Sequence, residues 1–575
     1  MATKKYPPKK PVNHIIAAPV KRNWSEYQKA LFKDIAQGVG HTVVVARAGS
    51  GKTSSIVEGF KYIPKGKKTL MCAFNKSIAD ELKEKAPSYV SCSTLHSLGF
   101  RGIKLAFGDG VQVDNYKTQS IVKKFLGDDR DTWDLNASIC KTVSLCKGFL
   151  VDTPTKISEI IDQFDIDLFE MLDKRDAFIS MVVQTLSACK AQKMVVDFDD
   201  MIWFPFVYRL SVGKFDYVFV DETQDLNACQ MQMVMSTLKS DSRVIAVGDP
   251  MQCIYAFRGA DSNSMSNLIK TLNAKILKLP VSYRCPKIVI ELAQTMVSDI
   301  ECPSTAMEGQ IHNIQEDAML EKIRPGDFLI SRTNAPLIKN CLRLLKAGIP
   351  ANIKGRDIGA NLTAFIKKSK AKSVIDFRQY VLDWQSDENE RLIRERKDTS
   401  AANDKAECLL NLSEDAKTVE EIKERIDKLF KDVDDSKKVM LGSTHRMKGL
   451  EANRVFLLQW TYRYNPIVEA EKRLALMEDE ELADDWVAMD GEIMAAPIVE
   501  TNAMDGSNSE MNLYYVGITR AKQELFLVKG KAKNPADYSK YGKYDNKKKL
   551  KKSDIPSLLD GDLWEEAYPI IHENY

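Results

Sequence analysis

The sequence predicts an α/β protein with two lobes built on parallel sheets, each lobe carrying a mainly helical insertion. Short apolar runs such as Thr42–Val45 and Tyr217–Val220 alternate with helix-compatible stretches, which is typical of parallel strands joined by crossover helices. This alternation stops between residues 101 and 204 and again between 361 and 437, where helical periodicity dominates. It resumes after each stretch, so each helical stretch is expected to interrupt a sheet.

The changes of pattern divide the chain into lobes, insertions and tails. Within the insertions, helical periods are clearest in 165–172 and 178–191, and the polar run 399–404 is expected to break a helix. The expected units are a disordered basic tail (1–22), a first lobe (23–100 and 205–276) with its insertion (101–204), a second lobe (277–360 and 438–530) with a small helical insertion (361–437), and a basic linker with an acidic and apolar end (531–575).

The bulk composition bounds the functional classes. A net charge of +3 over 575 residues does not decide for or against a polyanionic partner, because a basic groove can be compensated elsewhere. The 11 cysteines are scattered without a Cys-x-x-Cys pair and only 6 histidines are present, so neither a zinc framework nor an iron–sulfur cluster is indicated. No apolar run approaches bilayer-spanning length. We expect an intracellular protein without a membrane partner, cytoplasmic in a bacterial or phage-infected cell and nuclear in a eukaryotic one.

A phosphate-binding loop follows the first expected strand. The loop reads ARAGSGKT over residues 46–53 and precedes a helix-compatible stretch, Ser54–Phe60. In such a loop, backbone N–H groups and a helix N-terminus face the anion. Its lysine would hold the β- and γ-phosphates of ATP and its threonine would ligate Mg²⁺. We assign the cofactor contacts to Ala48, Gly49, Ser50, Gly51, Lys52 and Thr53.

Two carboxylates follow the expected strand Tyr217–Val220. A carboxylate at the carboxyl end of a strand can reach Mg²⁺ through water, and the next one can polarise an attacking water. Two acids in this place also occur as a plain solvated strand end. Because the phosphate loop is present in the same chain, we assign Asp221 to the metal and Glu222 to the general base.

A second fragment of a phosphate site lies near the other end of the chain, at 515–521 (YVGITRA). Its separation from the first loop suggests a nucleotide clamped between the two lobes. A nucleotide-dependent switch or a small-molecule kinase would explain the first loop and Asp221. It would leave the segment Tyr255–Arg258 and the distant Arg520 without a purpose.

Together these motifs resemble the UvrD/Rep group of superfamily-one DNA helicases. The segments 73–77 (AFNKS) and 93–98 (STLHSL) look most like the branch that contains the F-box DNA helicase. The match runs in order from Tyr27 to Lys522 and leaves both insertions and both tails outside. The remaining motifs are 221–225 (DETQD), 248–260 (GDPMQCIYAFRGA), 282–286 (SYRCP), 444–451 (THRMKGLE) and 515–520 (YVGITR).

The resemblance implies two RecA-like motor domains and an ATP- and Mg²⁺-dependent enzyme. Such an enzyme walks on single-stranded DNA and separates duplexes at single-strand/duplex junctions, with 3′ to 5′ polarity, in replication, repair or recombination. The resemblance also places Glu451 near the ribose and makes Gly449 part of the cofactor site.

The same resemblance gives roles to further residues of the nucleotide site. Gln28 would read the edge of adenine, Tyr283 would stack on the base, and Gln252 would sense the γ-phosphate. Arg284 and Arg520 would meet the γ-phosphate only when the lobes close, and would stabilise charge in the transition state. Lobe closure and hydrolysis would therefore be coupled.

DNA contacts are implied as stacking surfaces and phosphate-binding groups. Tyr255 and Phe257 flank one face of a loop against which a base can insert. Phe257 stands where most relatives carry Trp, and Phe74 is displaced by one residue from the Phe of many relatives. The implied contacts are Phe74, Asn75, Thr94, His96, Tyr255, Phe257, Arg258, Arg332, Asn334, Thr444 and His445.

Some alternatives stay open at the level of the sequence. Asn512 stands where many relatives have Arg, and the second insertion is short, so a translocase that strips bound proteins with little unwinding is a second interpretation. The segment 553–575 could dock on a protein partner or pack back on its own domain. The acidic region 469–510 is expected to be an exposed excursion or a surface that repels phosphate.

Overall fold

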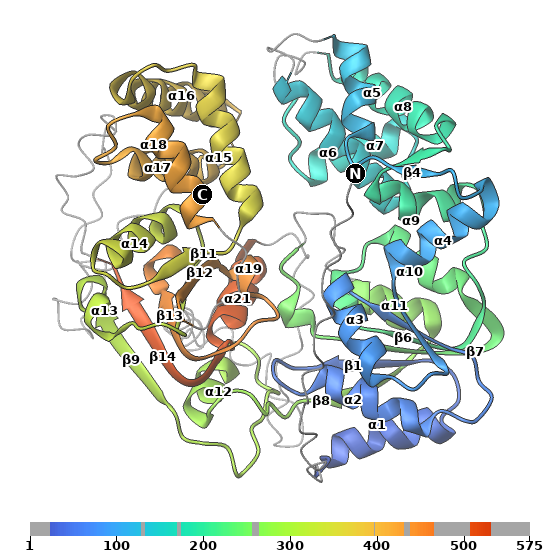
Figure 1. The fold of residues 1–575 in the computed structure, drawn as a ribbon. Coiled ribbons are helices and arrows are strands. Elements are labelled where there is room, and N and C mark those ends of the chain that lie inside the picture. Colours follow the sequence, from blue (N-terminus) through green and yellow to red (C-terminus); the bar gives the residue numbers. More distant parts are fainter. Residues whose placement is uncertain are drawn as a thin grey trace, which may run out of the picture.

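The computed structural model of the protein describes residues 23–127, 133–168, 174–255, 264–395, 397–430, 437–464 and 506–530. The tail 1–22, the segment 531–575, Phe257, Arg258 and most of the acidic region 469–510 lie outside the described residues. Figure 1 shows two α/β lobes side by side, each with a helical insertion at the same end of the molecule.

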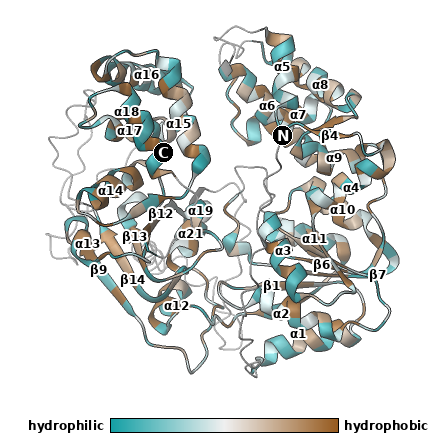
Figure 2. Ribbon diagram, in the orientation of Figure 1, coloured by the Kyte–Doolittle hydropathy of each residue, from teal (hydrophilic) through white to brown (hydrophobic). Residues whose placement is uncertain are grey.

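Six parallel strands form the sheet of the first lobe, in the order β3-β2-β6-β7-β1-β8. Neighbouring side chains of a strand face opposite sides of the sheet. Val43 therefore packs in the core with α4, α10 and α11, whereas Val44 packs in the core with α1, α2 and α3. In Figure 2 the strands are mainly hydrophobic. The bounds are β1 Thr42–Ala46, β2 Thr69–Ala73, β3 Val90–Thr94, β6 Phe215–Val220, β7 Leu238–Gly248, β8 Lys275–Leu279, α1 Glu26–Gln37, α2 Lys52–Gly59, α3 Lys76–Lys85, α4 Leu95–Phe107, α10 Ala228–Ser236 and α11 Ser264–Leu272.

The expected boundary between the lobes, at 276/277, is wrong. Strand β8 pairs with β1 along its whole length, from Thr42 opposite Lys275 to Ala46 opposite Leu279, so the first lobe continues at least to Leu279. The reason is that β8 is an edge strand, with lysines at 275 and 278 and only its last residue buried. Its sequence therefore lacks the continuous apolar run that marks the inner strands.

The insertion in the first lobe is a group of helices that shares the core of the first sheet. The region expected to be helical at 178–191 lies within α8. The expectation of a helix at 165–172 is wrong for 166–168, because α7 ends at Gln163 and Asp165 adopts a left-handed backbone conformation. Residues 169–172 lie outside the described part. The bounds are β4 Gln112–Val113, α5 Lys117–Leu126, α6 Trp133–Phe149, α7 Pro154–Gln163, α8 Arg175–Ala191, β5 Val195–Val196 and α9 Phe198–Val207.

A second parallel sheet forms the second lobe, in the order β11-β12-β10-β13-β14-β9. Phe456 and Phe526 from adjacent strands stack with ring centroids 4.2 Å apart on the face that the insertion helices share. The bounds are β9 Gln310–Gln315, β10 Phe328–Ser331, β11 Ala351–Ile353, β12 Val439–Ser443, β13 Ala452–Leu458, β14 Ala521–Lys529, α12 Lys287–Gln294, α13 Glu316–Lys322, α14 Ala335–Lys346, α19 Thr444–Met447 and α21 Gly506–Ile518. Short 3₁₀ helices are η1 Phe60–Tyr62, η4 Thr223–Asp225, η5 Pro250–Gln252 and η7 Gln459–Thr461.

The insertion of the second lobe contains α15 Arg356–Ser369, α16 Val374–Arg394, α17 Ser400–Ser413 and α18 Val419–Leu429. A break between α16 and α17 does include Thr399, the N-cap of α17, but the expectation is wrong for 400–404, which form the start of α17. Ser, Thr, Asn and Asp are favoured at helix starts as well as in loops. No helix in the described ranges is both long enough and apolar enough to cross a bilayer.

Gly99 fixes how closely α4 approaches α9, and so how the first insertion joins its lobe. A Cβ atom at this position would lie 1.9 Å from the Met201 carbonyl oxygen. We expect Gly99→Ala to force the two helices apart and to lower the free energy of unfolding by about 1–3 kcal/mol or more, as measured by urea denaturation. Gly110→Ala is the matched control, because its Cβ would lie 3.5 Å from its nearest neighbour, an ordinary contact. Equal midpoints for the two variants would contradict this interpretation.

Candidate nucleotide and DNA sites

The phosphate loop lies between β1 and α2, as its sequence predicts. Gly49 and Gly51 adopt left-handed backbone conformations, with φ of +74° and +76°. A Cβ at Gly49 would lie 2.6 Å from the Ser282 hydroxyl and 2.7 Å from the Cβ of Arg284, so glycine is required here. The buried Ser50 hydroxyl has no hydrogen-bond partner among the described residues. An unsatisfied donor, two glycines and a helix N-terminus fit a phosphate group.

Lys52 and the two carboxylates meet at the end of this loop. The Lys52 ammonium lies 3.0 Å from Glu222, whose backbone is also left-handed, with φ of +50°. Burial acts to raise the pKa of Glu222, but the positive charges of Lys52 and Lys448 outweigh it and lower that pKa. Burial and then the charge of Glu222 raise the pKa of Asp221. The carboxylate of Asp221 and the half-buried hydroxyl of Thr53 are oxygen ligands of the kind that Mg²⁺ prefers.

The predicted base-binding residues lie beside the same loop. Gln28 donates from its amide to the Ser55 hydroxyl over 2.9 Å, and the Tyr283 hydroxyl donates to the Gln28 amide oxygen over 3.5 Å. The Tyr283 backbone N–H donates to the Gly49 carbonyl over 2.9 Å, which fixes its exposed ring next to the phosphate loop. An exposed ring and an amide that both lie beside the phosphate loop suit the binding of a nucleobase.

The second lobe brings two guanidinium groups to the site. Arg284 forms an ion pair with Glu451 at 2.6 Å and donates to the Thr519 carbonyl over 3.4 Å. Arg520 is fully buried and donates to backbone carbonyls, including that of Leu450, which follows the left-handed Gly449. Burial and then the positive charge of Arg284 lower the pKa of Arg520 to about 9. Two adjacent guanidiniums with a surplus of positive charge fit a bound polyphosphate.

Contacts between the lobes close this site. The Tyr515 hydroxyl accepts from the Ala48 backbone N–H at 3.1 Å and donates to Asp249 at 3.4 Å. Burial raises the pKa of Tyr515, so its hydroxyl keeps the proton that it donates. The Lys448 ammonium donates to the Asp225 carboxylate over 2.6 Å and to the Gln252 carbonyl over 2.7 Å.

Sequence reasoning did not assign roles to four residues of this contact network. Each lies inside a motif that was recognised, and Asp225 belongs to the same motif as Asp221. Their importance appears only once the two lobes are placed together. The four are Asp225, Asp249, Lys448 and Tyr515. Gln252, which was assigned, is tied to the network because its side-chain amide donates to Asp249 over 2.8 Å.

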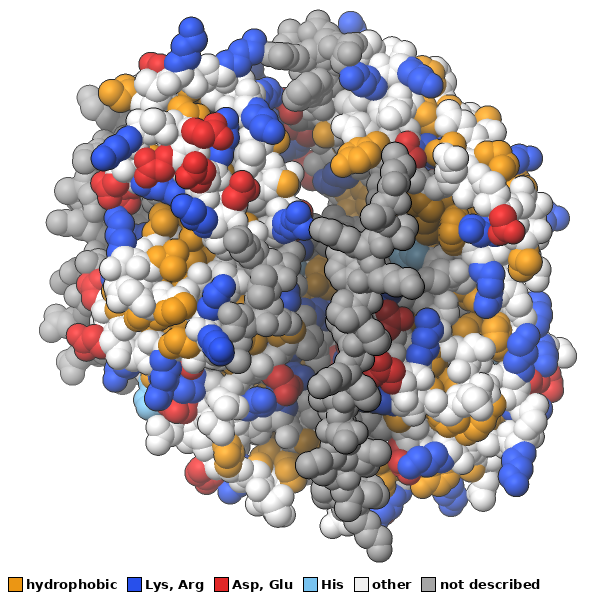
Figure 3. All heavy atoms as spheres, viewed as in Figure 1, with side chains coloured by type: hydrophobic (Ala, Val, Ile, Leu, Met, Phe, Trp, Pro, Cys, Tyr) orange, Lys and Arg blue, Asp and Glu red, His pale blue; other side chains and the backbone are white. Residues whose placement is uncertain are grey.

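Part of the predicted DNA surface lies between the lobes. The rings of Phe74 and Tyr255 are nearly parallel, with an angle of 17° and centroids 6.4 Å apart. The Tyr255 hydroxyl donates to the His445 carbonyl over 2.9 Å, so this ring contacts both lobes. In Figure 3 the surface is hollowed between the lobes, and Lys and Arg side chains lie on both lobes beside the hollow. Phe257 and Arg258 lie outside the described residues.

The other predicted DNA contacts, apart from His96, make internal hydrogen bonds. Asn75 and Thr94 cap α3 and α4, and burial lowers the pKa of His96, which favours a neutral imidazole. Thr444 is fully buried against the Tyr462 hydroxyl, so its side chain is not exposed to a strand in this arrangement. The rest are held by acids: Arg332 pairs with Glu510 at 2.8 Å, and Asn334 donates from its backbone N–H to Asp404 over 3.0 Å.

Tyr515→Phe tests the contact between the lobes. The variant keeps the ring but removes the hydroxyl that accepts from Ala48 and donates to Asp249. We expect hydrogen–deuterium exchange of residues 46–51 to rise by roughly 5- to 30-fold, because losing a buried hydrogen bond costs about 1–2 kcal/mol. Tyr462→Phe is the matched control, since it removes a buried hydroxyl that bonds Thr444 within the second lobe. Equal exchange in both variants would contradict a closing role for Tyr515.

Comparison with known proteins agrees with this geometry. The UvrD/REP helicase N-terminal domain model matches residues 27–273, and the UvrD-like helicase C-terminal domain model matches residues 362–532. The chain is 24% identical to F-box DNA helicase protein 1 of Schizosaccharomyces pombe over 84% of this chain and 55% of that protein. It is also 24% identical to F-box DNA helicase 1 of Gallus gallus, over 84% of this chain and 47% of that protein.

A bacterial relative matches over a shorter stretch. ATP-dependent DNA helicase PcrA of Bacillus subtilis is 27% identical over 45% of this chain and 38% of that protein. The chain thus spans about half the length, or less, of these curated relatives. The two family models match parts of both lobes, and the chain belongs to the UvrD/Rep family of DNA helicases.

Proposed function

We propose that this protein is an ATP- and Mg²⁺-dependent motor that moves on single-stranded DNA and separates duplexes with 3′ to 5′ polarity. The observation that carries the proposal is the composite nucleotide site, in which a phosphate loop of one lobe meets two arginines of the other. Membership of the UvrD/Rep family supports the same activity. Such a motor would work where DNA is, in the cytoplasm of a bacterial cell or in a nucleus.

Within this function the residues around the phosphate loop prepare ATP for attack by water. Lys52 would hold the β- and γ-phosphates, and Thr53 and Asp221 would hold Mg²⁺. When bound, Mg²⁺ neutralises charge on the phosphate oxygens. Glu222 would orient and deprotonate the water, and its lowered pKa keeps it ionised for that task at neutral pH. Gln252 would bind near the γ-phosphate. When that phosphate leaves, a shift of Gln252 would reach Asp249 through the hydrogen bond between them.

Arg284 and Arg520 couple hydrolysis to lobe closure. Arg284 is held by Glu451 in the described arrangement, and a triphosphate would compete for its guanidinium. Both arginines come from the second lobe, so they reach the γ-phosphate only while the lobes are in contact. Charge stabilisation of this kind accelerates phosphoryl transfer by roughly 10³- to 10⁵-fold. Loss of the γ-phosphate removes their shared partner and favours opening.

The aromatic pair connects this cycle to DNA. The 6.4 Å between the ring centroids of Phe74 and Tyr255 is close to twice the ~3.4 Å rise between stacked bases, so a small opening would admit one base. Tyr255 contacts His445 and lies 5.0 Å below the Lys448 ammonium. Because Lys448 also bonds Asp225 beside the nucleotide site, lobe movement would change the grip on the base.

The activity is tested with oligonucleotides that carry 3′ or 5′ single-stranded tails. We expect ATP hydrolysis to rise at least tenfold when single-stranded DNA is added, and unwinding to require the 3′ tail. Chelation of Mg²⁺ should abolish hydrolysis. Equal hydrolysis with and without DNA would refute the motor, and unwinding from the 5′ tail alone would refute the polarity.

Arg520→Ala tests the composite site. We expect the variant to keep DNA binding and to lose roughly 10³-fold or more in hydrolysis, since the charge that stabilises the transition state is absent. Because Arg520 is fully buried, thermal unfolding must be compared with wild type, and Arg520→Lys gives a second variant that keeps a positive charge. Arg343→Ala, in the same lobe but bonded to Asp317, is the matched control. Normal turnover of folded Arg520→Ala would exclude this role.

A motor that strips proteins from single strands with little unwinding is the second candidate. The small insertion of the second lobe, whose described helices lie between 356 and 429, favours it, because less surface is then available to hold a duplex. Comparing displacement of a bound protein with duplex separation on the same tailed DNA distinguishes the two. Deleting 553–575 tests whether that segment recruits a protein partner.

A further inference from the structure

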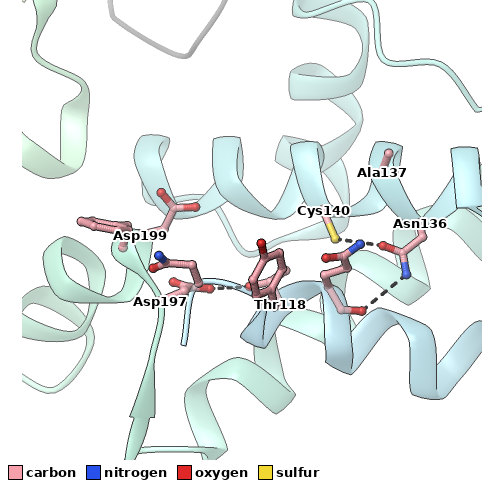
Figure 4. A pocket seen from close by; sticks show the side chains of 10 residues that line it. Thr118, Asn136, Ala137, Cys140, Asp197 and Asp199 are labelled. Atoms are coloured by element: carbon pink, nitrogen blue, oxygen red, sulfur yellow. Dashed lines mark hydrogen bonds between the residues drawn. The ribbon is translucent and has the colours of Figure 1, made fainter. Parts of the chain in front are cut away.

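A cavity in the first insertion is not used by the proposed motor cycle. Its volume is about 370 Å³, and it lies between the start of α5, the middle of α6 and the start of α9. Figure 4 shows Asp197 and Asp199 at one end, Asn136 and Cys140 at the other, and Thr118 between them. The volume is ample for one planar ring system of the size of a nucleobase.

Two aromatic rings belong to the lining of this cavity and are open to solvent. Tyr116 is 69% exposed and Phe198 is 52% exposed, which is unusual for rings that serve packing alone. Phe198 contacts the His96 imidazole edge to face, with ring centroids 5.8 Å apart. His96 lies two residues after β3, where a DNA contact is proposed. The cavity is therefore next to the expected path of the strand.

The polar groups of the lining suit an uncharged ligand with mixed donors and acceptors. The side-chain amides of Asn115 and Gln119 make no hydrogen bond to any described residue. Asn136 donates to the Gln119 carbonyl over 3.4 Å, which holds this part of the lining in place. An amide presents a donor and an acceptor side by side, and this matches the edges of nucleobases.

The wall behind the cavity is rigid and nearly balanced in charge. Lys117 pairs with Asp200 at 2.6 Å, and Lys147 pairs with Asp197 at 3.0 Å and with Asp200 at 2.8 Å, all of them buried. Asp199 also lines the cavity, and burial raises its pKa. With its lysines already paired, this wall offers no cation to a phosphate, and the ligand that fits is a neutral ring.

We propose that this cavity holds one unstacked nucleobase of the DNA strand on which the motor moves. The base would stack on Tyr116 or Phe198 and pair its edge with the amides of Asn115 and Gln119. This inference rests on the proposed function and adds a second base-binding place, in the insertion, to the slot between Phe74 and Tyr255. A base held here would have to be released before each step along the strand. The cavity would therefore fix where each step ends and would make the motor pause there.

The test uses the full chain, a non-hydrolysable ATP analogue, and a duplex whose single-stranded 3′ tail carries one abasic site. The abasic site is moved along the tail position by position, and the affinity for each DNA is measured by fluorescence anisotropy. We expect one position, distinct from that read by Phe74 and Tyr255, at which the missing base weakens binding about tenfold, within the range for a stacked base. In Tyr116→Ala and in Gln119→Leu this position should lose its effect, while other positions keep theirs.

Matched controls make the result specific. Gln184→Leu removes another exposed amide from the same insertion, on α8, and should keep the wild-type pattern. Circular dichroism melting of each variant verifies that it is folded. If Tyr116→Ala and Gln119→Leu leave the dependence of affinity on the abasic position unchanged, the cavity is not a base site. The proposed motor function is not affected by that result. If wild type neither binds the tail nor hydrolyses ATP faster with DNA, the proposed function fails, and this inference fails with it.

Discussion

The hydrogen bond from the Ala48 backbone N–H to the Tyr515 hydroxyl joins the phosphate loop directly to the second lobe. The phosphate loop can cradle an anion from one side only, because its backbone donors point in one direction. The groups that would cover the other side, Arg284 and Arg520, lie in the second lobe, just before α12 and just before β14. Whatever moves the second lobe therefore changes the catalytic site. A motor needs this property, and a rigid single-domain ATPase lacks it.

The charges of the site are unevenly balanced, which would give a bound nucleotide a direct effect on closure. Lys52 already pairs with Glu222, and Arg284 pairs with Glu451. Among the described residues, Arg520 forms no ion pair with a carboxylate, although it is fully buried beside Arg284. Burying an uncompensated charge costs free energy, and the negative charge of a bound triphosphate would offset that cost. Binding of ATP would thus stabilise the closed arrangement more than its contacts with the first lobe alone would suggest.

The sequence predicts the local structure and the site motifs well, but not the relations between distant elements. The phosphate loop, the N-cap at Ser25 and the inner strands follow from apolar runs, glycines and capping residues, which act over a few positions. The edge strand β8 is missed because it is mostly exposed, and because its pairing partner β1 lies far along the chain. The run 399–404 is misread because the same residues favour loops and helix starts. Lys448 and Asp225 are recognised only as motif members, since their pairing crosses 223 positions.

The strand order of the first sheet places the proposed nucleotide and base sites along one edge. Parallel strands present their carboxyl ends at one edge, so the loops after β1, β2, β3, β6 and β7 lie in a row set by the order β3-β2-β6-β7-β1. The nucleotide loop follows β1, and Phe74 follows β2. Between them lie the ends of β6 and β7, which carry Glu222 and Gln252. Within the first lobe, a signal from phosphate to base would pass through those two loops, which are also the loops that Lys448 bonds from the other lobe. The first insertion begins beyond β3, at the end of the row farthest from the nucleotide, so a base held there would sense lobe movement last.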